Sequence, residues 1–243
     1  MTNKEIRNYW NKRAEEDANN ATTNDIYLRK LEQDILTTTI RHVQPRTVVD
    51  LGCGDAATTI HLAMLFPNIL FTGMDYATEM LNLAARNVET CRYKGYTLSN
   101  LLLVEQSVEK LTKFDYDLVI SCRCLINLGS LAAADSMFSK LSLNKYALIE
   151  NFLAQHHRLN NFRVLSGLNP IPIRPHNTYL YPVMHSMSFA DSYYYATRVV
   201  YAAKCSADSV EPDYNSIEHK TAVTLGNIPE LNCAPMRLIY NNI

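Results

Sequence analysis

The feature that most constrains the fold is a short apolar run that ends in two closely spaced glycines. Thr47–Leu51 (TVVDL) is rich in β-branched residues, Gly52-Cys53-Gly54 follows it, and Ala56–Phe66 then has the apolar spacing of a helix. This pattern predicts a buried strand, a tight turn and a helix. Glycine suits such a turn because it lacks Cβ and lets the backbone come close to a ligand.

Strands and helices alternate on either side of this turn. The further expected strands are 70–74, 101–104, 116–121 and 146–151, and the helices between them are 78–89 and about 130–141. Such alternation is typical of a mainly parallel sheet flanked by helices. We therefore predict one α/β domain over residues 1–243, with a Rossmann-like, seven-stranded, mainly parallel sheet, since one core can accommodate this length.

The first 44 residues and the part of the chain after residue 154 depart from this alternation of strands and helices. Residues 1–44 predict two helices ahead of the sheet, which we interpret as an N-terminal helical lid. Residues 155–195 hold four prolines, paired histidines and clustered tyrosines without clean periodicity, so we expect an inserted cap for the acceptor there. Ala196–Ala203 (ATRVVYAA) and Met236–Tyr240 (MRLIY) are expected to finish the sheet as an antiparallel pair.

Composition excludes several classes of partner. With 23 Lys+Arg against 24 Asp+Glu, no strong field attracts nucleic acid or an anionic membrane. The apolar runs are too short to span a bilayer, so we expect no membrane partner. The six cysteines lack the spacing of a metal site, and nothing at the start reads as a signal peptide. We therefore expect reduced thiols, a cytoplasmic location and no metal, while a homodimer is allowed but not required.

The glycines alone leave two cofactors open. Gly52-x-Gly54-x-x-Ala57 also fits the pattern of dinucleotide-binding turns, and Asp75, 23 residues after Gly52, can bind the ribose hydroxyls of either nucleotide. Asp55 stands where a dinucleotide would place its pyrophosphate, and its charge disfavours that anion. Asp55 can alternatively cap the following helix, or do both.

Four stretches together resemble a known family. Val48–Gly54 (VVDLGCG), Gly73–Tyr76 (GMDY), Met80 and Phe114–Ser121 (FDYDLVIS) resemble the successive motifs of class I S-adenosylmethionine-dependent methyltransferases, over about residues 8–151. The resemblance implies an enzyme of the EC 2.1.1 class with S-adenosylmethionine as cofactor, S-adenosylhomocysteine as product and a small-molecule acceptor.

The resemblance also implies particular cofactor contacts. Asp50, Gly52 and Gly54 would line the methionine end, Asp75 would hold the ribose, Tyr76 and Met80 would flank the adenine, Ser107 would lie near the adenine edge, and Cys122 with Arg123 would form the floor. The sequence departs from the family at Ala56, where a third glycine is common, and at Ser107, where an aspartate is common.

The acceptor end is predicted from less specific signals. Arg123–Leu128 (RCLINL), Glu150–Asn151 with Asn160–Arg163 (NNFR), and Arg174–Leu180 (RPHNTYL) resemble a branch associated with polysaccharide and sugar pathways. The resemblance favours O-methylation of a sugar or nucleotide-sugar. The residues that we assign to catalysis are His176, as the first choice of general base, Glu150 and Arg123.

Each remaining acceptor-end group has two interpretations. Arg163 and Arg174 can bind an acceptor phosphate or pair with acids such as Glu150. His156 and His157 could ligate a metal, although surface positions are favoured. The cluster Tyr193–Tyr195 can pack the cap or line a pocket, and the thiols of Cys122 and Cys124 are better explained as small core residues than as nucleophiles.

Two other functions compete with that of a methyltransferase. A non-catalytic partner subunit that binds S-adenosylmethionine would keep the same pocket without turnover. An NAD(P)-dependent oxidoreductase shares the glycine turn but is disfavoured by Asp55 and by the lack of a Tyr-x-x-x-Lys pair.

Overall fold

A single mainly parallel sheet organises the chain. The computed structural model describes residues 1–181, 188–190, 196–225 and 236–241. The strands are β1 (Thr47–Leu51), β2 (Leu70–Asp75), β3 (Leu101–Glu105), β4 (Leu118–Cys122), β5 (Tyr146–Asn151), β6 (Ser188–Ala190) and β7 (Met236–Asn241). They lie in the order β3-β2-β1-β4-β5-β7-β6. The predicted Rossmann-like α/β fold is confirmed.

The strand order reverses at β1. This strand pairs in parallel with β2 on one side and with β4 on the other, so that Asp50 lies opposite both Gly73 and Ile120. The chain therefore leaves β1 toward one edge and returns to its other side, which creates a crevice at the carboxyl ends of the strands. Strand β7 is antiparallel to both β5 and β6.

Helices lie where the periodicity predicts them over the first two thirds of the chain. They are α1 (Asn3–Glu16), α2 (Ile26–Val43), α3 (Ala57–Leu65), α4 (Thr78–Tyr93) and α5 (Leu131–Leu141), with short 3-10 turns η1 (Val108–Lys110) and η2 (Leu125–Asn127). Side-chain caps fix several of the starts. Thr2, Asp25 and Ser130 accept hydrogen bonds from the backbone N–H groups of the first turns of α1, α2 and α5.

The two faces of the sheet form separate cores. Alternate residues of the strands pack on α2, α3, α4 and α7 (Ala196–Ala207) through a cluster that includes Val48, Ile120 and Val199. The intervening residues, such as Val49 and Val119, pack on α5 and the 3-10 turns. Both faces are therefore covered, as a parallel sheet requires.

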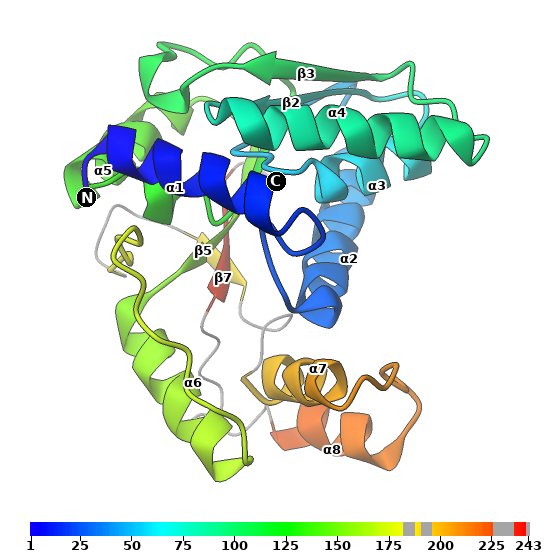
Figure 1. Ribbon diagram of the computed structural model, residues 1–243, viewed down its shortest axis with the longest axis vertical. Helices are drawn as coiled ribbons and strands as arrows, with labels where there is room; N and C mark the ends of the chain where they lie inside the picture. Colours follow the sequence, from blue (N-terminus) through cyan, green and yellow to red (C-terminus); the bar gives the residue numbers. More distant parts are fainter. Residues whose placement is uncertain (182–187, 191–195, 226–235, 242–243) are drawn as a thin grey trace.

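The structure corrects the expected end of the sheet. Ala196–Ala203 lies within helix α7, and the short strand β6 takes its place beside β7. The region expected to be an irregular cap also begins with a helix, α6 (Leu153–Leu165), while α8 (Ile217–Leu225) was not predicted. In Figure 1, α1 and α4 lie together on one side of the strand ends, and α6 and α7 lie on the other.

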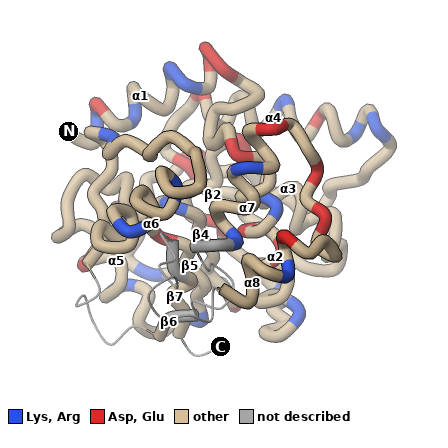
Figure 2. Tube along the Cα trace, turned by 90° about the horizontal axis from the view of Figure 1, so that it is seen from below, with Lys and Arg blue, Asp and Glu red and all other residues tan. Residues whose placement is uncertain are grey.

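Positive and negative charges are mixed over the part of the chain that the structure describes. Acidic and basic residues are interspersed along α1, α2 and α4 (Figure 2). Among the described residues, no helix has the length and apolarity to cross a membrane. The same part of the chain holds no group of three or more potential metal-ligating side chains.

Candidate active site

A cavity with a volume of about 600 Å³ opens at the carboxyl ends of the parallel strands. Residues that follow β1 to β5 line it, together with parts of α1, α6 and α7. Seven of the eight predicted cofactor residues and two of the three predicted catalytic residues belong to this lining. They are Gly52, Gly54, Asp75, Tyr76, Met80 and Ser107, which are joined by Cys122, Arg123 and His176.

The turn after β1 has a left-handed backbone. Gly52 and Gly54 have φ values of +67° and +56°, and Ala56 follows at +56°. A Cβ on Gly52 would lie 2.8 Å from the Cys124 sulfur, and one on Gly54 would lie 2.7 Å from the Thr22 methyl. Both glycines are required by backbone conformation and space. Ala56 adopts the same region with a side chain, which costs roughly 1–2 kcal/mol.

Asp75 ends β2 with both carboxylate oxygens in use. Its Oδ2 accepts a hydrogen bond from Gly54 N at 2.9 Å, and its Oδ1 accepts one from Ala77 N at 2.8 Å. Burial is the main cause that raises the pKa of this carboxyl group above its usual value. Asp75 thereby joins the glycine turn to the start of α4 while lining the cavity, and each oxygen keeps a lone pair for a further donor.

Asp50 lies behind the turn and is not among the lining residues described. Its Oδ2 accepts a hydrogen bond from the Thr59 hydroxyl at 2.6 Å. Burial raises the pKa of Asp50 to about 7, although the Thr59 hydrogen bond acts in the opposite direction. Asp50 can therefore act on a ligand through its charge from beneath the turn rather than by contact.

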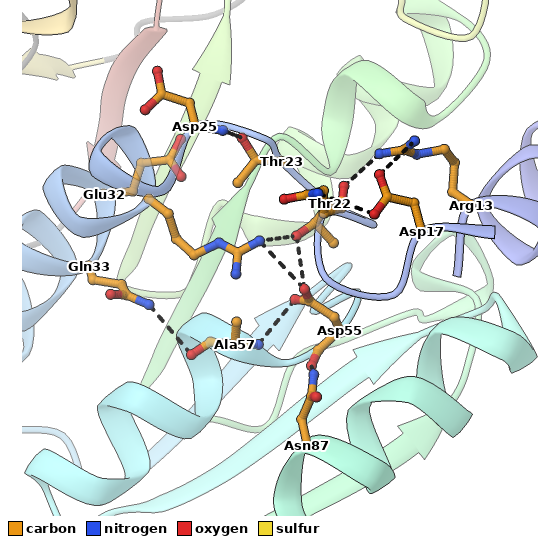
Figure 3. Close-up of polar contacts among 12 residues, drawn as sticks. Arg13, Asp17, Thr22, Thr23, Asp25, Glu32, Gln33, Asp55, Ala57 and Asn87 are labelled. Atoms are coloured by element: carbon orange, nitrogen blue, oxygen red, sulfur yellow. Dashed lines mark hydrogen bonds and ion pairs between the residues drawn. The ribbon is translucent and has the colours of Figure 1, made fainter. Parts of the chain in front are cut away.

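Asp55 anchors the N-terminal segment to the glycine turn (Figure 3). Its carboxylate accepts hydrogen bonds from Thr22 Oγ1 at 3.2 Å and from Ala57 N at 3.2 Å, and it pairs with Arg29 at 3.5 Å. Asn87 of α4 donates to the Asp55 carbonyl. Arg29 compensates this carboxylate, which is not among the lining residues described, so the expectation that it disfavours a diphosphate stays a prediction. Asp55 accepts a hydrogen bond at the start of α3, but the N-cap residue of α3 is Ala56, which has no side-chain cap.

Arg123 is held in a left-handed conformation at the floor of the cavity, with φ +62°. Its Nη2 donates to Glu32 Oε2 of α2 at 3.1 Å, where the Glu32 side chain is only 1% exposed. Burial raises the pKa of Glu32, and the Arg123 guanidinium partly offsets that shift. The ion pair fixes Arg123 against α2.

His176 is buried between the cavity and the first helix. Its ring stacks on Tyr9 at a centroid distance of 4.0 Å and meets Trp10 edge-on at 5.5 Å. Burial, with a smaller contribution from the Arg174 charge, lowers the pKa of His176 to about 4. The imidazole is therefore neutral near pH 7 and can accept a proton there, although it is a weak base.

Glu150, the third predicted catalytic residue, lies behind the described lining. It is completely buried at the end of β5 and accepts hydrogen bonds from Leu125 N at 2.9 Å and Ile126 N at 3.3 Å. Burial raises the pKa of Glu150 to about 8. These contacts hold turn η2, whose last residue, Asn127, lines the cavity.

The cap residues are divided between cavity and surface. Arg163 and Arg174 both line the cavity, and neither pairs with Glu150. His156 lies on α6 rather than on a strand and is buried, which corrects its expected surface position, whereas His157 is exposed. Tyr193–Tyr195 lie outside the described residues.

The cysteines near the site are poor nucleophiles. Burial raises the pKa of the Cys53, Cys122 and Cys124 thiols well above the usual range. Because only the thiolate is an effective nucleophile, these residues are better explained as packing groups.

Sequence reasoning missed two aromatic residues of the cavity. Tyr9 and Trp10 lie in the NYWNKR segment, which was interpreted only as part of a helix. Trp10 also donates from Nε1 to Asn127 Oδ1 at 3.3 Å. The adjacent Tyr-Trp pair on an otherwise polar helix was the available signal, since large aromatic side chains need a partner surface.

One part of the chain matches the model of a known family. Residues 48–142 match the model of a family described as a methyltransferase domain. A search of curated protein sequences finds no relative. The matched domain contains the glycine turn, Asp75 and the residues after β4, and it indicates an enzyme of the EC 2.1.1 class.

Two solved structures with TM-scores above 0.5 support the fold. Magnesium protoporphyrin IX methyltransferase (ChlM) from Synechocystis PCC 6803 with bound SAH is 20% identical, with a TM-score of 0.55 over 77% of this chain and 90% of that one. The same protein with bound SAM is 19% identical, with a TM-score of 0.52 over 77% of this chain and 87% of that one. PKMT2 from Rickettsia typhi is 18% identical over 51% of this chain, with a TM-score of 0.41, and the chain spans 24% of its length.

Proposed function

We propose that the chain transfers a methyl group from S-adenosylmethionine to a small-molecule acceptor bound in the cavity at the strand ends. The main support for this proposal is that a left-handed glycine turn and a buried carboxylate, Asp75, line the same cavity within the matched methyltransferase domain. The absence of Cβ atoms at Gly52 and Gly54 gives the backbone the close approach that a nucleoside cofactor requires.

The residues present fit this cofactor. Asp75 can accept hydrogen bonds from the ribose hydroxyls, Tyr76 and Met80 can flank the adenine, and Ser107 can reach its edge. Gly52 and Gly54 offer backbone to the methionine end, Cys122 closes the floor, and Asp50 acts from beneath the turn. When bound, the cofactor supplies the electrophilic methyl carbon.

The protein's own contribution is to align the acceptor and to take its proton. His176 is the proposed proton acceptor, because its neutral ring is directed by Tyr9 and Trp10 and lines the cavity. Arg123, fixed by Glu32, orients the acceptor. We now propose Glu150 as a positioning residue, since its carboxylate holds η2 and stays behind the lining.

The acceptor class is a separate proposal. O-methylation of a sugar or nucleotide-sugar is our hypothesis from the resemblance of the cap stretches, with residues 1–44 acting as lid and 155–195 as cap. The neighbour of similar length is named for a porphyrin, and its name lends the sugar no support. An assay that detects S-adenosylhomocysteine in the presence of nucleotide-sugars tests the hypothesis, and no turnover with any of them would eliminate it.

Calorimetric titration tests the cofactor assignment. We expect micromolar binding of S-adenosylhomocysteine and no binding of NAD or NADP. Asp75→Asn should weaken binding about tenfold or more, because a charge-assisted hydrogen bond to a ribose hydroxyl is lost. Asp115→Asn, at an exposed carboxylate whose side chain is 90% accessible, is the matched control and should bind normally.

Three outcomes separate the alternatives. Binding of a nicotinamide cofactor in place of S-adenosylhomocysteine would overturn the proposed function. Binding of S-adenosylhomocysteine without turnover on a broad acceptor panel would favour the non-catalytic partner subunit. Binding with turnover that is lost in His176→Ala, while cofactor affinity is kept, would support the enzyme and its proton acceptor.

A further inference from the structure

Two cations in the cavity wall have no carboxylate partner. The lining arginines Arg13 and Arg123 pair with Asp17 at 3.6 Å and Glu32 at 3.1 Å. Arg163 and Arg174 form no ion pair with any residue in the described part of the chain. A guanidinium that lines a cavity without a counter-charge is suited to bind an anionic ligand.

Both arginines belong to one braced unit. Arg163 lies on α6, and its Nε donates to the Asn169 carbonyl of the following loop at 2.9 Å. Asn160, one turn earlier, exchanges two hydrogen bonds of 2.8 Å with the backbone of Ile171. The loop that leads to Arg174 is thus tied back to the helix that carries Arg163, which limits the entropy that ligand binding would cost.

The groups that interact electrostatically with this unit come from the start of α2 and from the loop after α6. Asp25 of α2 is the lining carboxylate that acts on Arg163, but it accepts hydrogen bonds from Leu28 N and from Ser206 of α7 and lies beyond ion-pair distance. Arg174 acts electrostatically on His176 and on Tyr179, which places its charge near both. The remaining cap groups in the lining, His156, Asn177 and Tyr179, carry no negative charge near neutral pH.

The lining segments therefore differ in charge. Asp75 and Glu109 come from the segments that follow β2 and β3, whereas Arg163 and Arg174 come from α6 and the loop after it and outnumber Asp25, the carboxylate that acts on Arg163. A cationic sulfonium and an anionic acceptor would each meet the complementary sign.

We propose that the acceptor carries an anionic group, a phosphate or a carboxylate, which Arg163 and Arg174 bind together as an anchor separate from the methylated atom. This inference rests on the proposed function, because it names the acceptor class of the same cavity. Each arginine can donate two hydrogen bonds to such a group, so the anchor fixes orientation as well as position.

The only tryptophan of the chain provides the readout. Trp10 lines the cavity and contacts His176, so its fluorescence should change when the cap end is occupied. Protein saturated with S-adenosylhomocysteine would be titrated with inorganic pyrophosphate in one arm and glutarate in the other, at constant ionic strength. We expect a saturable change in at least one arm.

Matched variants show whether the two arginines bind the anion. Arg163→Gln with Arg174→Gln should weaken anion binding by about tenfold or more and leave the affinity for S-adenosylhomocysteine unchanged. Arg158→Gln removes an exposed cation from the same helix and should stay within about twofold of the parent. Retained cofactor binding shows that the double variant is folded.

Each outcome decides the inference. Saturation by pyrophosphate alone identifies a phosphate-bearing acceptor, and saturation by glutarate alone identifies a carboxylate. No saturation in either arm, or equal weakening by Arg158→Gln, would overturn the anionic anchor while leaving the proposed function intact. Failure of S-adenosylhomocysteine to bind would instead remove the proposed function and this inference with it.

Discussion

At the scale of single residues, three carboxylates lie at or next to strand ends and have different roles in the site. Asp75 faces the cavity and bridges two backbone segments, whereas Asp50 and Glu150 lie behind the described lining and hold a hydroxyl and a 3-10 turn. The sequence pattern places all three at or next to the ends of predicted strands. Which of them faces a ligand is set by side-chain direction and by neighbours distant in sequence, so it could not be predicted from spacing.

The raised pKa of Glu150 predicts how stability depends on pH. Because the folded value is about 8 and the usual value is 4.5, the folded state binds more protons than the unfolded state between these pH values. The stabilisation of the folded state by protonated Glu150 is fully present below pH 4.5 and is lost as pH rises through 8. Glu150→Gln removes this titration, so the free energy of unfolding of the variant relative to the parent should rise by at least about 1 kcal/mol from pH 5 to pH 9.

Urea unfolding at the two pH values measures this difference. Glu15→Gln, at an exposed carboxylate on α1, is the control and should track the parent at both. A Glu150→Gln variant that also tracks the parent would show that Glu150 is ionised in the folded protein throughout this range.

At the scale of elements, the glycine turn combines a backbone constraint with a steric one. Gly52→Ala should destabilise the protein by about 1–2 kcal/mol for its left-handed backbone and by roughly 1–3 kcal/mol more for overlap with the Cys124 side chain. Adding Cys124→Ala should recover only a fraction of the second part, because it removes the sulfur at 2.8 Å but keeps the Cβ at 2.9 Å. Gly95→Ala shares a positive φ in open space, so it should show the backbone cost alone.

A double-mutant cycle on thermal or urea unfolding separates the two contributions. Additive effects of Gly52→Ala and Cys124→Ala would contradict the steric contact between the turn and the segment after β4.

Some helices and strands were predicted at their observed positions from sequence patterns alone. Strands β1 and β5 lie at their predicted bounds, and α5 begins after its Ser130 cap, because buried strands and capped helices leave local signals. Helix α7 was mistaken for a strand since Val199, Val200 and Tyr201 favour β structure locally. Its fold is decided by packing, in which Val199 and Val200 contact the main core and Ala202 and Cys205 contact Tyr27.

At the scale of the whole molecule, the cavity is assembled from parts remote in sequence. Tyr9 and Trp10 of α1 meet His176, and Arg29 of α2 pairs with Asp55. Thr22 also donates to Asp55 (Figure 3). These contacts have no counterpart in any local motif, so the sequence patterns brought most of the assigned cofactor residues to one cavity but did not predict what α1 and the segment before α2 add to it.

Cofactor binding should therefore stabilise the entire fold. At one hundred times the dissociation constant, S-adenosylhomocysteine adds about 2.7 kcal/mol to the free energy of unfolding, which corresponds to a rise of about 5–10 °C in Tm for a chain of this size. Differential scanning fluorimetry measures the shift. Asp75→Asn should show much less of it at the same ligand concentration, and an equal shift in both proteins would place the ligand elsewhere.

The position of β7 has a consequence for synthesis on the ribosome. This strand follows every other strand in the sequence, yet it inserts between β5 and β6 and pairs with both. While the chain is being translated, β5 must present an open edge of backbone donors and acceptors after the cofactor half of the sheet has already emerged. The nascent protein is thus exposed to strand pairing with neighbouring chains until residues 236–241 arrive, which is the stage at which a chaperone would protect it most.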